Sequence, residues 1–575
     1  MIITKITKAK RIFILIYGAF CMHGAAIAQP LAGSYTINSA VATGGTNFQS
    51  FSDFAASLNS NGISANVTAT VTAGSGPYQE QVVFSSPAGT SATSGIVLEG
   101  SGETLTAITD SSDRHALRLA DCDYFRINNL HVVRDPASTH AFYGIHILGT
   151  GNHINLSNCE VDMTGTSSTL IGGYIASGSA TSILVTGDFH DVTITGCVAT
   201  GGGYGASVFG LLGNLASGIV INNNTFNDFH SNGVYLRETQ GAVVSNNHFD
   251  KSTPNITSAN AIQVAQAANI NTEIFGNFIR VSQVNNGSVS LRGIYLFDGT
   301  GHRVYNNVIH EIHLTSGNFT AIEVRTGGTA PIIAFNTISI DNPLSTTGDL
   351  IGISEELSNT NSILRNNLVH ITQPTTGDAA CLALGAIATV TTAFDSDYNL
   401  FWIPGGNVAM KSSLVPVYYP TLANWNAASG KDGNSVSLDP MLVSPTLPQP
   451  TNPAADNLGI TYGGITTDVL GVTRGVIPDI GAYEFTATGI PSYTAAPVAC
   501  YPNPSENLLY VELPQQSKTA FALIADATGK TTAIHCFQRE NKLIISTADL
   551  PAGLYMLKIM CDEKIYSTRF LKTNL

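Results

Sequence analysis

Residues 221–226 read INNNTF and residues 244–249 read VSNNHF, and both segments follow one pattern. The pattern is an aliphatic residue, two further residues, an asparagine, one residue, and an aliphatic or aromatic residue. The asparagine recurs at intervals of 23, 30, 30, 29 and 31 residues. A fixed period in this range is typical of stacked supersecondary units. The repeated asparagines are Asn224, Asn247, Asn277, Asn307, Asn336 and Asn367.

A second motif precedes each asparagine. It is a small residue followed by an aliphatic, a variable and an aliphatic residue, as in 233–236 (GVYL) and 293–296 (GIYL). This alternation predicts strands with one buried face. The distance from the motif to the asparagine is almost constant, so each coil is expected to contain about three short strands and a tight turn at the asparagine. The sequence therefore predicts an all-β chain that folds as a parallel β-helix.

The repeated asparagine is expected to occupy the turn itself, because asparagine tolerates the left-handed backbone conformation. Stacked coils place equivalent residues about 4.8 Å apart, so the asparagine side chains are expected to form a hydrogen-bonded ladder. Cys159 and Cys197 fill the same position upstream, and Asn399 fills it downstream. Two stacked thiols or a disulfide between Cys159 and Cys197 are both compatible with this arrangement.

Both ends of the chain carry further segments. Basic residues at 5–11, an apolar stretch at 12–20 and the small-residue site at 26–28 predict a signal peptide over residues 1–28. The predicted β-helix with its end segments covers 29–485, and it begins with an amphipathic helix at residues 51–61 that caps the first coil. Residues 486–497 have linker composition, and residues 498–575 hold alternating segments that predict a small β-sandwich.

Composition excludes several classes of function. Charged residues make up 11% of the chain, but beyond the signal peptide no apolar run reaches the roughly 18 residues of a spanning helix, so no transmembrane segment is expected in the mature chain. Residues 29–490 have 14 basic and 33 acidic residues, a net charge of −19. Such a body repels phosphate backbones, which disfavours nucleic acid as a partner.

The coils resemble right-handed parallel β-helix proteins of the pectate-lyase-like superfamily over residues 65–400. Residues 76–80 (GPYQE) are similar to their entry coil, and residues 395–400 (DSDYNL) and 478–484 (PDIGAYE) are similar to the closing segment of Bacteroidota examples. The resemblance implies a right-handed coil. It also implies that the strand preceding that of the asparagine turn belongs to the sheet that lines a polysaccharide groove.

The C-terminal region resembles the type A sorting domain of the Bacteroidota type IX secretion system. The resemblance rests on three motifs in order, at 501–504 (YPNP), 525–530 (ADATGK) and 550–555 (LPAGLY). It implies the type IX machinery as a partner and a location outside the cell or on the outer-membrane surface. Whether the body is released or anchored is left open by the sequence.

The strand that precedes the strand of the asparagine turn has two outward positions in each coil. Stacking the coils aligns the residues at each position into a column. Between Tyr235 and Glu356 these columns carry aromatic rings, carboxylates and both arginines, whereas both ends are small or aliphatic. Because sugar rings stack on aromatic faces and sugar hydroxyls need polar partners, this segment is the candidate groove. The first predicted column is His146, Leu184, Gly210, Tyr235, Gln263, Tyr295, Glu323, Ser354 and Ala383. The second is Leu148, Thr186, Leu212, Arg237, Ala265, Phe297, Arg325, Glu356 and Gly385.

Residue types in this groove suit polysaccharide chemistry. Hydrolysis needs two carboxylates, which Glu323 and Glu356 or Asp298 could supply. β-Elimination needs neutralisation of a uronate together with a base and an acid. The candidate catalytic residues are Glu323, Arg325, Tyr295 and Arg237, and the candidate substrate-binding residues are Tyr235, Gln263, Phe297, Asp298 and Glu356.

The function expected from the sequence is polysaccharide binding by an exported β-helix. Lyase or hydrolase activity is left open, because the chain lacks the motif patterns of polygalacturonases and pectate lyases. No resident metal site is predicted, although Glu323, Glu356 and Asp298 are oxygen ligands that could recruit Ca²⁺. The alternative is a non-catalytic surface or adhesion scaffold. Glu355 falls in an inward position, and a local register shift is the preferred explanation for it.

Overall fold

The computed structural model describes residues 29–486, apart from 139–140, 254–257, 267, 283–288, 326–329, 357–360 and 386–393, and residues 496–573, apart from 514–519, 527–530, 535, 540, 549 and 562–563. The expected signal peptide lies outside the described residues, as does most of the expected linker. Among the helices of the described part, none has the length and apolarity that membrane crossing requires.

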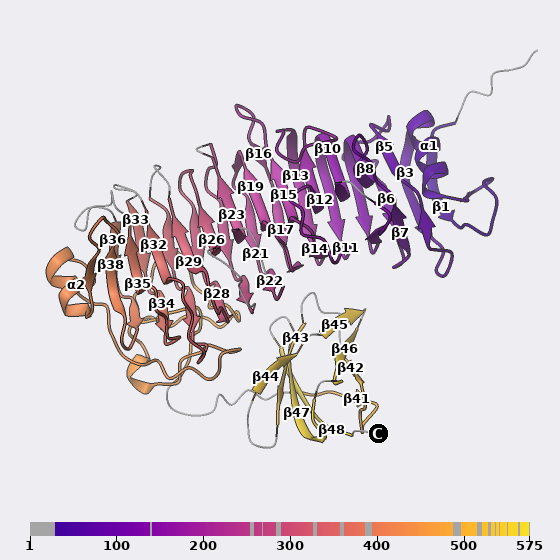
Figure 1. Cartoon of the computed structure of the whole chain (residues 1–575). Helices are drawn as coiled ribbons and strands as arrows, with labels where there is room; N and C mark the ends of the chain where they lie inside the picture. Colours follow the sequence, from indigo (N-terminus) through magenta and orange to yellow (C-terminus); the bar gives the residue numbers. More distant parts are fainter. Residues whose placement is uncertain are drawn as a thin grey trace, which may run out of the picture.

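Most of the chain winds into a β-solenoid of about 12 turns, which confirms the predicted fold (Figure 1). A full turn contributes one strand to each of three faces built of parallel strands, called face 1, face 2 and face 3 in their order along a turn. Face 3 is a 12-stranded sheet, whereas faces 1 and 2 join into a 27-stranded sheet. They join because two long strands, β8 (His115–Asn128) and β10 (Phe142–Ser157), run through the corner between them.

Besides the first halves of β8 and β10, face 1 contains β5 (Val82–Ser85), β12 (Ile171–Ser177), β15 (Tyr204–Phe209), β19 (Asn232–Arg237), β23 (Ala259–Ala265), β26 (Ser290–Leu296), β29 (Asn318–Val324), β32 (Leu350–Glu355), β35 (Ala379–Leu384) and β38 (Asn407–Lys411), which pairs with β39 (Val417–Tyr419). Besides their second halves, face 2 contains β1 (Leu31–Ile37), β2 (Asn47–Phe48), β3 (Ile63–Val71), β6 (Ile96–Glu99), β13 (Asp188–Thr195), β17 (Val220–Asn222), β21 (Val243–Ser245), β24 (Glu273–Phe275), β27 (Arg303–Tyr305), β30 (Ile332–Ala334), β33 (Ser362–Arg365) and β36 (Phe394–Asp397), and the short strands β16 (Ala216–Ser217) and β20 (Thr239–Gln240) lie next to it. Face 3 contains β4 (Tyr78–Gln79), β7 (Thr104–Ala107), β9 (His131–Arg134), β11 (Glu160–Met163), β14 (Val198–Gly201), β18 (Thr225–Asn227), β22 (His248–Lys251), β25 (Phe278–Val281), β28 (Val308–Ile312), β31 (Thr337–Ile340), β34 (Leu368–Ile371) and β37 (Leu400–Trp402).

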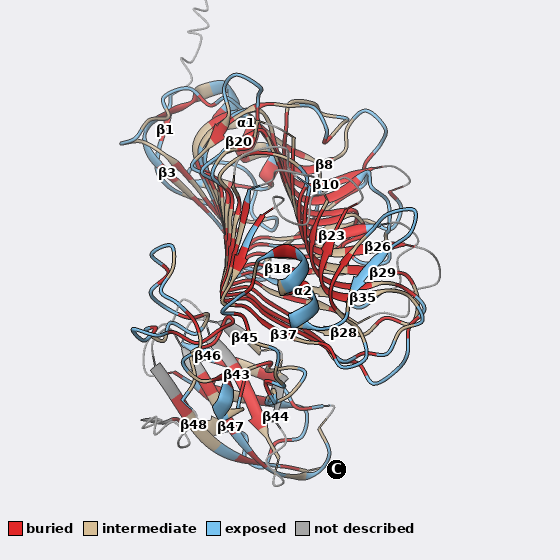
Figure 2. Ribbon diagram, turned by 90° about the vertical axis from the view of Figure 1, so that its left-hand side faces the viewer, coloured by how far each residue is buried: buried red, intermediate tan, exposed pale blue. Residues whose placement is uncertain are grey.

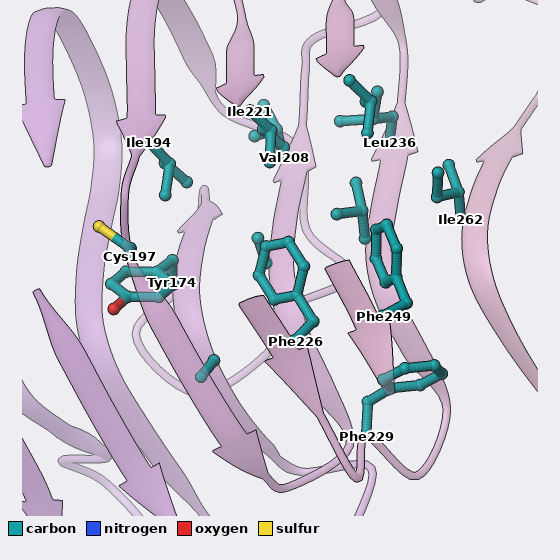
Figure 3. Close-up of a cluster of buried hydrophobic side chains, with 14 of the residues drawn as sticks. Tyr174, Ile194, Cys197, Val208, Ile221, Phe226, Phe229, Leu236, Phe249 and Ile262 are labelled. Carbon is teal, nitrogen blue, oxygen red and sulfur yellow. The ribbon is translucent and has the colours of Figure 1, made fainter. Parts of the chain in front are cut away.

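The hydrophobic core lies between the three faces, whose strands consist largely of buried residues (Figure 2). Aliphatic side chains from faces 1 and 2 meet aromatic rings from face 3, such as Phe226 and Phe249, whose centroids are 5.3 Å apart (Figure 3). These rings explain the small residue of the second motif. A Cβ atom on Gly233 would lie 2.5 Å from the Phe249 ring, so only glycine fits there without rearrangement.

The predicted asparagine ladder is present at the corner between faces 2 and 3. Asn247 is fully buried, and its backbone N–H and Nδ2 both donate to Asn277 Oδ1, each at 3.0 Å. Its Nδ2 also donates to the Ile221 carbonyl at 2.9 Å. The same pattern links the successive asparagines Asn224, Asn247, Asn277, Asn307, Asn336, Asn367 and Asn399.

The turn conformation differs from the expectation. The left-handed residue is the one before each ladder asparagine, for example Asn246 (φ 54°) before Asn247 and Gly276 (φ 66°) before Asn277. The preceding residue makes the corner, so the ladder side chain is free to point inward and hydrogen-bond between coils. The motif therefore combines two roles, and the second asparagine of residues 246–247 has the buried one.

Upstream of Asn224 the ladder position is taken by thiols. Cys159 and Cys197 are buried and both are free, so the structure shows stacked thiols without a disulfide. Each Sγ donates to a carbonyl of the preceding coil, Ile127 at 3.7 Å and Leu156 at 3.5 Å. The thiol thus replaces the donor function of the asparagine amide. The hydrogen bond with Cys197, together with burial, raises the pKa of the Cys159 thiol.

Both ends of the solenoid are capped. At the N-terminal end, α1 (Phe51–Asn61), the predicted capping helix, buries Phe51, Phe54, Ala55 and Leu58. At the C-terminal end, α2 (Leu422–Ser429) buries Trp425, which donates from Nε1 to Asp432 Oδ2 at 2.7 Å. The carboxylate of Asp432 also accepts hydrogen bonds from Ser396, Asn399 and Ser435.

The segment after α2, which includes the short helix η1 (Pro453–Ala455), folds back along the outside of the coils. Asn306 donates to the Thr467 carbonyl at 2.8 Å and accepts from Arg474 at 2.9 Å. The guanidinium of Arg474 lies 4.0 Å from the Phe335 ring centroid. Asn366 accepts from the Ile460 N–H at 2.9 Å, so the closing segment is fixed to several coils.

The C-terminal region forms two antiparallel sheets around its own hydrophobic core, consistent with the predicted β-sandwich. Asn503 of the first sorting motif accepts from the Leu571 N–H at 2.8 Å, which joins the motif to the last strand. One sheet contains β40 (Ala496–Pro497), β43 (Ala520–Ala525), β44 (Thr531–Ile534), β47 (Gly553–Cys561) and β48 (Lys564–Lys572), and the other contains β41 (Cys500–Tyr501), β42 (Leu508–Glu512), β45 (Cys536–Arg539) and β46 (Lys542–Ser546).

Candidate functional site

The outward columns of face 1 follow the prediction in the candidate groove but not upstream of it. The register of the strands places Ile175 and Ser207 in the first column, where Leu184 and Gly210 were expected. In the second column Ser177 and Phe209 replace Thr186 and Leu212. The first column, read from strand pairs, is Arg118, His146, Ile175, Ser207, Tyr235, Gln263, Tyr295, Glu323, Ser354, Ala383 and Met410.

Tyr295 and Glu323 lie in register on β26 and β29, and an arginine that the sequence analysis missed holds them together. Arg292 donates from Nε to Glu323 Oε2, and its guanidinium lies 4.5 Å from the Tyr295 ring centroid. The Glu323 residue is only 6% exposed. Burial raises the pKa of its carboxyl, and the hydrogen bond from Arg292 opposes the rise. The result is a shielded carboxyl next to an aromatic ring, which suits proton exchange with a ligand.

The second column adds an exposed aromatic and cationic surface beside this carboxyl. Phe297 is 38% exposed, and its ring centroid is 5.7 Å from that of Tyr295 in an edge-on arrangement. The guanidinium of Arg325 lies 5.8 Å from the Phe297 centroid and is exposed to solvent. Glu356 accepts a hydrogen bond from Ser354 Oγ at 2.7 Å. Glu323, Arg325, Tyr295, Phe297 and Glu356 are thus gathered on neighbouring coils, as predicted.

Tyr235 and Arg237 form a second group, two coils upstream. Tyr235 stacks on Tyr204 with centroids 6.1 Å apart and meets Phe209 edge-on at 4.9 Å. Arg237 Nε lies 3.2 Å from Glu238 Oε2, so the charge of Arg237 is already paired with the neighbouring residue at the end of the strand. This pairing makes Arg237 less available than Arg325 to neutralise a ligand carboxylate.

Gln263 and Asp298, the remaining predicted residues, differ in what they can offer a ligand. Gln263 is half-buried between the two groups, and its Oε1 accepts from Asn260 Nδ2 at 3.1 Å. The Asp298 carboxylate accepts from the Gly299 N–H at 2.8 Å, and its backbone carbonyl pairs with His302 Nε2 at 3.2 Å. Asp298 therefore stabilises the turn after β26, which argues against a role in the groove.

The Glu355 side chain points inward, as the alternation of β32 requires, and the pairing of β32 has no register shift that would turn this side chain outward. It is in register with Val324 and Leu384 and is 1% exposed. Ser362 Oγ donates to Glu355 Oε2 at 3.0 Å. The preferred explanation of a local bulge was therefore wrong.

A polar cluster at the upstream end of face 1 was missed altogether. His115 and His146 are fully buried on the outward side of β8 and β10. Asp113 Oδ1 lies 2.6 Å from His115 Nδ1 and 3.0 Å from an Arg118 nitrogen, and His146 Nε2 is 3.0 Å from Ser177 Oγ. Burial lowers the pKa of His115 to about 4 and holds the pKa of His146 well below its ordinary value.

An apolar cluster covers this end of face 1. Ile183, in the segment that joins β12 to β13, packs with Tyr143, Ile175 and Tyr204. This segment was read from the sequence as part of the strand columns, although it lies outside the strands. The upstream end of face 1 is therefore closed by packing, in contrast to the exposed Phe297 ring and Arg325 guanidinium downstream.

Metal binding finds little support in the geometry. No group of three or more histidine, cysteine, aspartate or glutamate side chains is placed to hold a metal ion within the part of the chain that the structure describes. Loops 251–260 and 282–292, beside the candidate groove, contain residues 254–257 and 283–288, which lie outside the described residues.

Two sequence families match parts of the chain. Residues 160–338 match the right handed beta helix region, and residues 499–573 match the secretion system C-terminal sorting domain. No curated protein matches the sequence. The sorting domain marks the protein for type IX secretion to the cell surface or the extracellular space.

Comparison with solved structures gives matches of low similarity. A GH136 lacto-N-biosidase from Eubacterium ramulus is 12% identical with a TM-score of 0.30, and the match covers 55% of this chain and 64% of that one. PfbA, a surface adhesin of Streptococcus pneumoniae, is 12% identical with a TM-score of 0.33, covering 61% and 86%. Tailspike protein 2 of bacteriophage CBA120 is 13% identical with a TM-score of 0.20, covering 94% and 77%. The chain is a right-handed parallel β-helix protein with a C-terminal secretion sorting domain.

Proposed function

We propose that this exported protein binds an extracellular polysaccharide on face 1, around Tyr295, Glu323 and Arg325. The observation that carries the proposal is the buried Glu323 carboxyl, positioned by Arg292 beside an exposed aromatic and cationic surface. An exposed ring can stack on a sugar, and an exposed guanidinium can bind a sugar carboxylate or hydroxyl. The secretion sorting domain supports the proposal, because it brings face 1 to where polysaccharides are found.

Catalysis at this site would use Glu323 as the proton donor or acceptor. A carboxyl whose pKa is raised by burial retains its proton nearer to neutral pH, as a general acid requires. Arg325 would neutralise a uronate in an elimination, and Tyr295 and Glu323 would take up and deliver the protons. If Ca²⁺ is recruited, Glu356 and Glu323 are the oxygen ligands that would hold it.

Replacing Arg325 with alanine is expected to weaken glycan binding by about tenfold, the effect of losing a hydrogen bond to a charged group. A glycan panel with and without Ca²⁺, read by binding, by absorbance near 235 nm and by reducing ends, identifies the ligand and any reaction. Arg280→Ala is the matched control, because Arg280 lies on face 3 beside Asp250 and Glu311. Equal binding by the Arg325→Ala variant and the unmodified protein would contradict the proposed site.

A further inference from the structure

A cleft of 450 Å³ lies on face 2 at the N-terminal end of the solenoid, away from the face 1 site. This volume is within the ~300–1,000 Å³ of small-molecule sites. The outward residues Thr68, Val97 and Arg126 are in register across three coils and form one side. The hairpin of residues 91–95 also lines the cleft, and Asn66 Oδ1 fixes it by accepting from the Gly95 N–H at 2.8 Å.

Two aromatic side chains line this cleft from backbone positions that disfavour them. Tyr124 (φ 54°) and His153 (φ 57°) occupy the left-handed corner where the chain passes from face 1 to face 2. Among non-glycine residues this conformation is uncommon, and it is rarer for tyrosine than for histidine. Later coils place mostly glycine, asparagine or aspartate at the same corner, namely Asp191, Gly218, Gly241, Asn271, Gly301 and Asn361.

Strained residues of this kind are concentrated at functional sites, since the strain must be outweighed by something the side chain does. Here the two rings lie together with centroids 4.5 Å apart and an interplanar angle of 50°. The His153 imidazole is held from behind by Asp191, whose Oδ2 is 3.3 Å from its Nδ1. Packing does not require the rings, because the corner works with glycine elsewhere in the same stack.

Arg126 supplies a cation whose charge is not neutralised locally. Its side chain is exposed in the cleft, and it forms an ion pair with none of the acidic side chains in the described ranges. Guanidinium groups bind carboxylates through two parallel hydrogen bonds. In a body with far more acidic than basic residues, an exposed and uncommitted arginine between aromatic rings and hydroxyl groups is suited to an anionic ligand.

We propose that this cleft binds an acidic sugar residue, with its carboxylate on Arg126 and its ring against Tyr124 and His153. The hydroxyl groups of Thr68, Ser91 and Thr93 provide the partners that sugar hydroxyls need. A small inorganic anion would use Arg126 but leave both rings without a role. The proposal is independent of the face 1 site, because the two sites share no residue.

The test is binding of sodium glucuronate, glucose and acetate to the purified protein by calorimetry. Saturable binding of glucuronate, with glucose and acetate each at least about tenfold weaker, is expected from one charged hydrogen-bonded pair plus ring stacking. Acetate binding as tightly as glucuronate would overturn the sugar assignment. Glucose binding as tightly would overturn the role of Arg126, and no saturable binding of glucuronate would overturn the site.

Two variants separate a ligand site from a structural role. Arg126→Ala should weaken glucuronate binding by at least about tenfold, whereas Arg365→Ala, whose guanidinium is already 2.6 Å from Asp395 on the same face, should leave it unchanged. Tyr124→Asn should weaken binding without lowering the melting temperature, because asparagine suits the left-handed corner. A melting temperature that falls with Tyr124→Asn while binding persists would show that the ring serves the fold alone and would contradict the proposal.

Discussion

Replacing Asn247 with leucine is expected to destabilise the solenoid by about 4 kcal/mol, because the substitution leaves several buried polar groups without hydrogen-bond partners. The Asn224 N–H and Nδ2 both donate to Asn247 Oδ1, at 2.9 and 3.0 Å, and the Ile221 carbonyl accepts from Asn247 Nδ2. Leucine has a similar size but offers none of these partners. The measurement is the midpoint of unfolding in urea, followed by circular dichroism.

The neighbouring asparagine provides a matched control. Asn246 is exposed and left-handed, and the next coil has Gly276 at the same corner. Asn246→Gly should therefore change stability by no more than about 0.5 kcal/mol. If Asn247→Leu and Asn246→Gly shifted the urea midpoint equally, the ladder would not be the main stabilising feature of this corner.

Acidification from pH 6.5 to pH 4 is expected to destabilise the protein strongly, by about 3 kcal/mol for each buried histidine whose pKa is lowered to about 4. Burial lowers the pKa of His115, His302 and His310 from 6.5 to about 4. Because the folded pKa lies below the unfolded one, this stability is complete above pH 6.5 and is lost as the pH falls towards 4. Asp479, whose pKa burial raises to about 7, acts in the opposite direction and offsets about one histidine.

The contribution of one histidine can be tested separately. His302 Nδ1 accepts from the Thr272 N–H at 3.2 Å, and its Nε2 donates to the Asp298 carbonyl at 3.2 Å, so the ring must be neutral. His302→Gln retains an acceptor and a donor but cannot take up a proton, so the melting temperature of this variant should vary less with pH. A melting temperature of the unmodified protein that stays constant between pH 7 and pH 4.5 would contradict the expectation.

The fold could be predicted from the sequence because the coils repeat one physical arrangement. The spacing of Asn277, Asn307 and Asn336 reports directly on coil length, and their alignment in one ladder is confirmed. The turn was assigned to the wrong residue of the Asn246–Asn247 pair, because both a left-handed corner and a buried ladder favour asparagine. Only the three-dimensional arrangement distinguishes the two uses.

The predicted residues of the upstream columns were wrong where the length of the connecting segment is not constrained. Counting back a constant distance from Cys197 reached Leu184, whereas the strand β12 ends at Ser177, before a long segment leads to β13. A segment that leaves the stack can lengthen at little cost, so spacing carries no information across it. Downstream, where Tyr295 and Glu323 follow regular coils, the same counting was correct.

Two parts of the site could not be found from the columns considered. Arg292 has the same parity as the inward residues Ile294 and Leu296, so the alternation places it inward. It faces outward because the strand departs from the alternation at Gly293, and the motif carries no signal for its pairing with Glu323. The cluster of His115, Arg118 and His146 gave no such signal. Its members belong to outward positions, which are polar in most sheets, and its burial depends on an apolar covering segment elsewhere in the sequence.

The ladder also has a direction. In each asparagine the carbonyl end faces the preceding coil and the N–H₂ end faces the following one, so seven side-chain dipoles add along the solenoid axis. The positive end of this row emerges at Asn399, whose Nδ2 lies 3.2 Å from the carboxylate of Asp432. Asp432 therefore acts on the whole row as an acidic residue acts at the amino end of an α-helix. The closing cap thus gives the polarised stack an electrostatic terminus as well as a hydrophobic one.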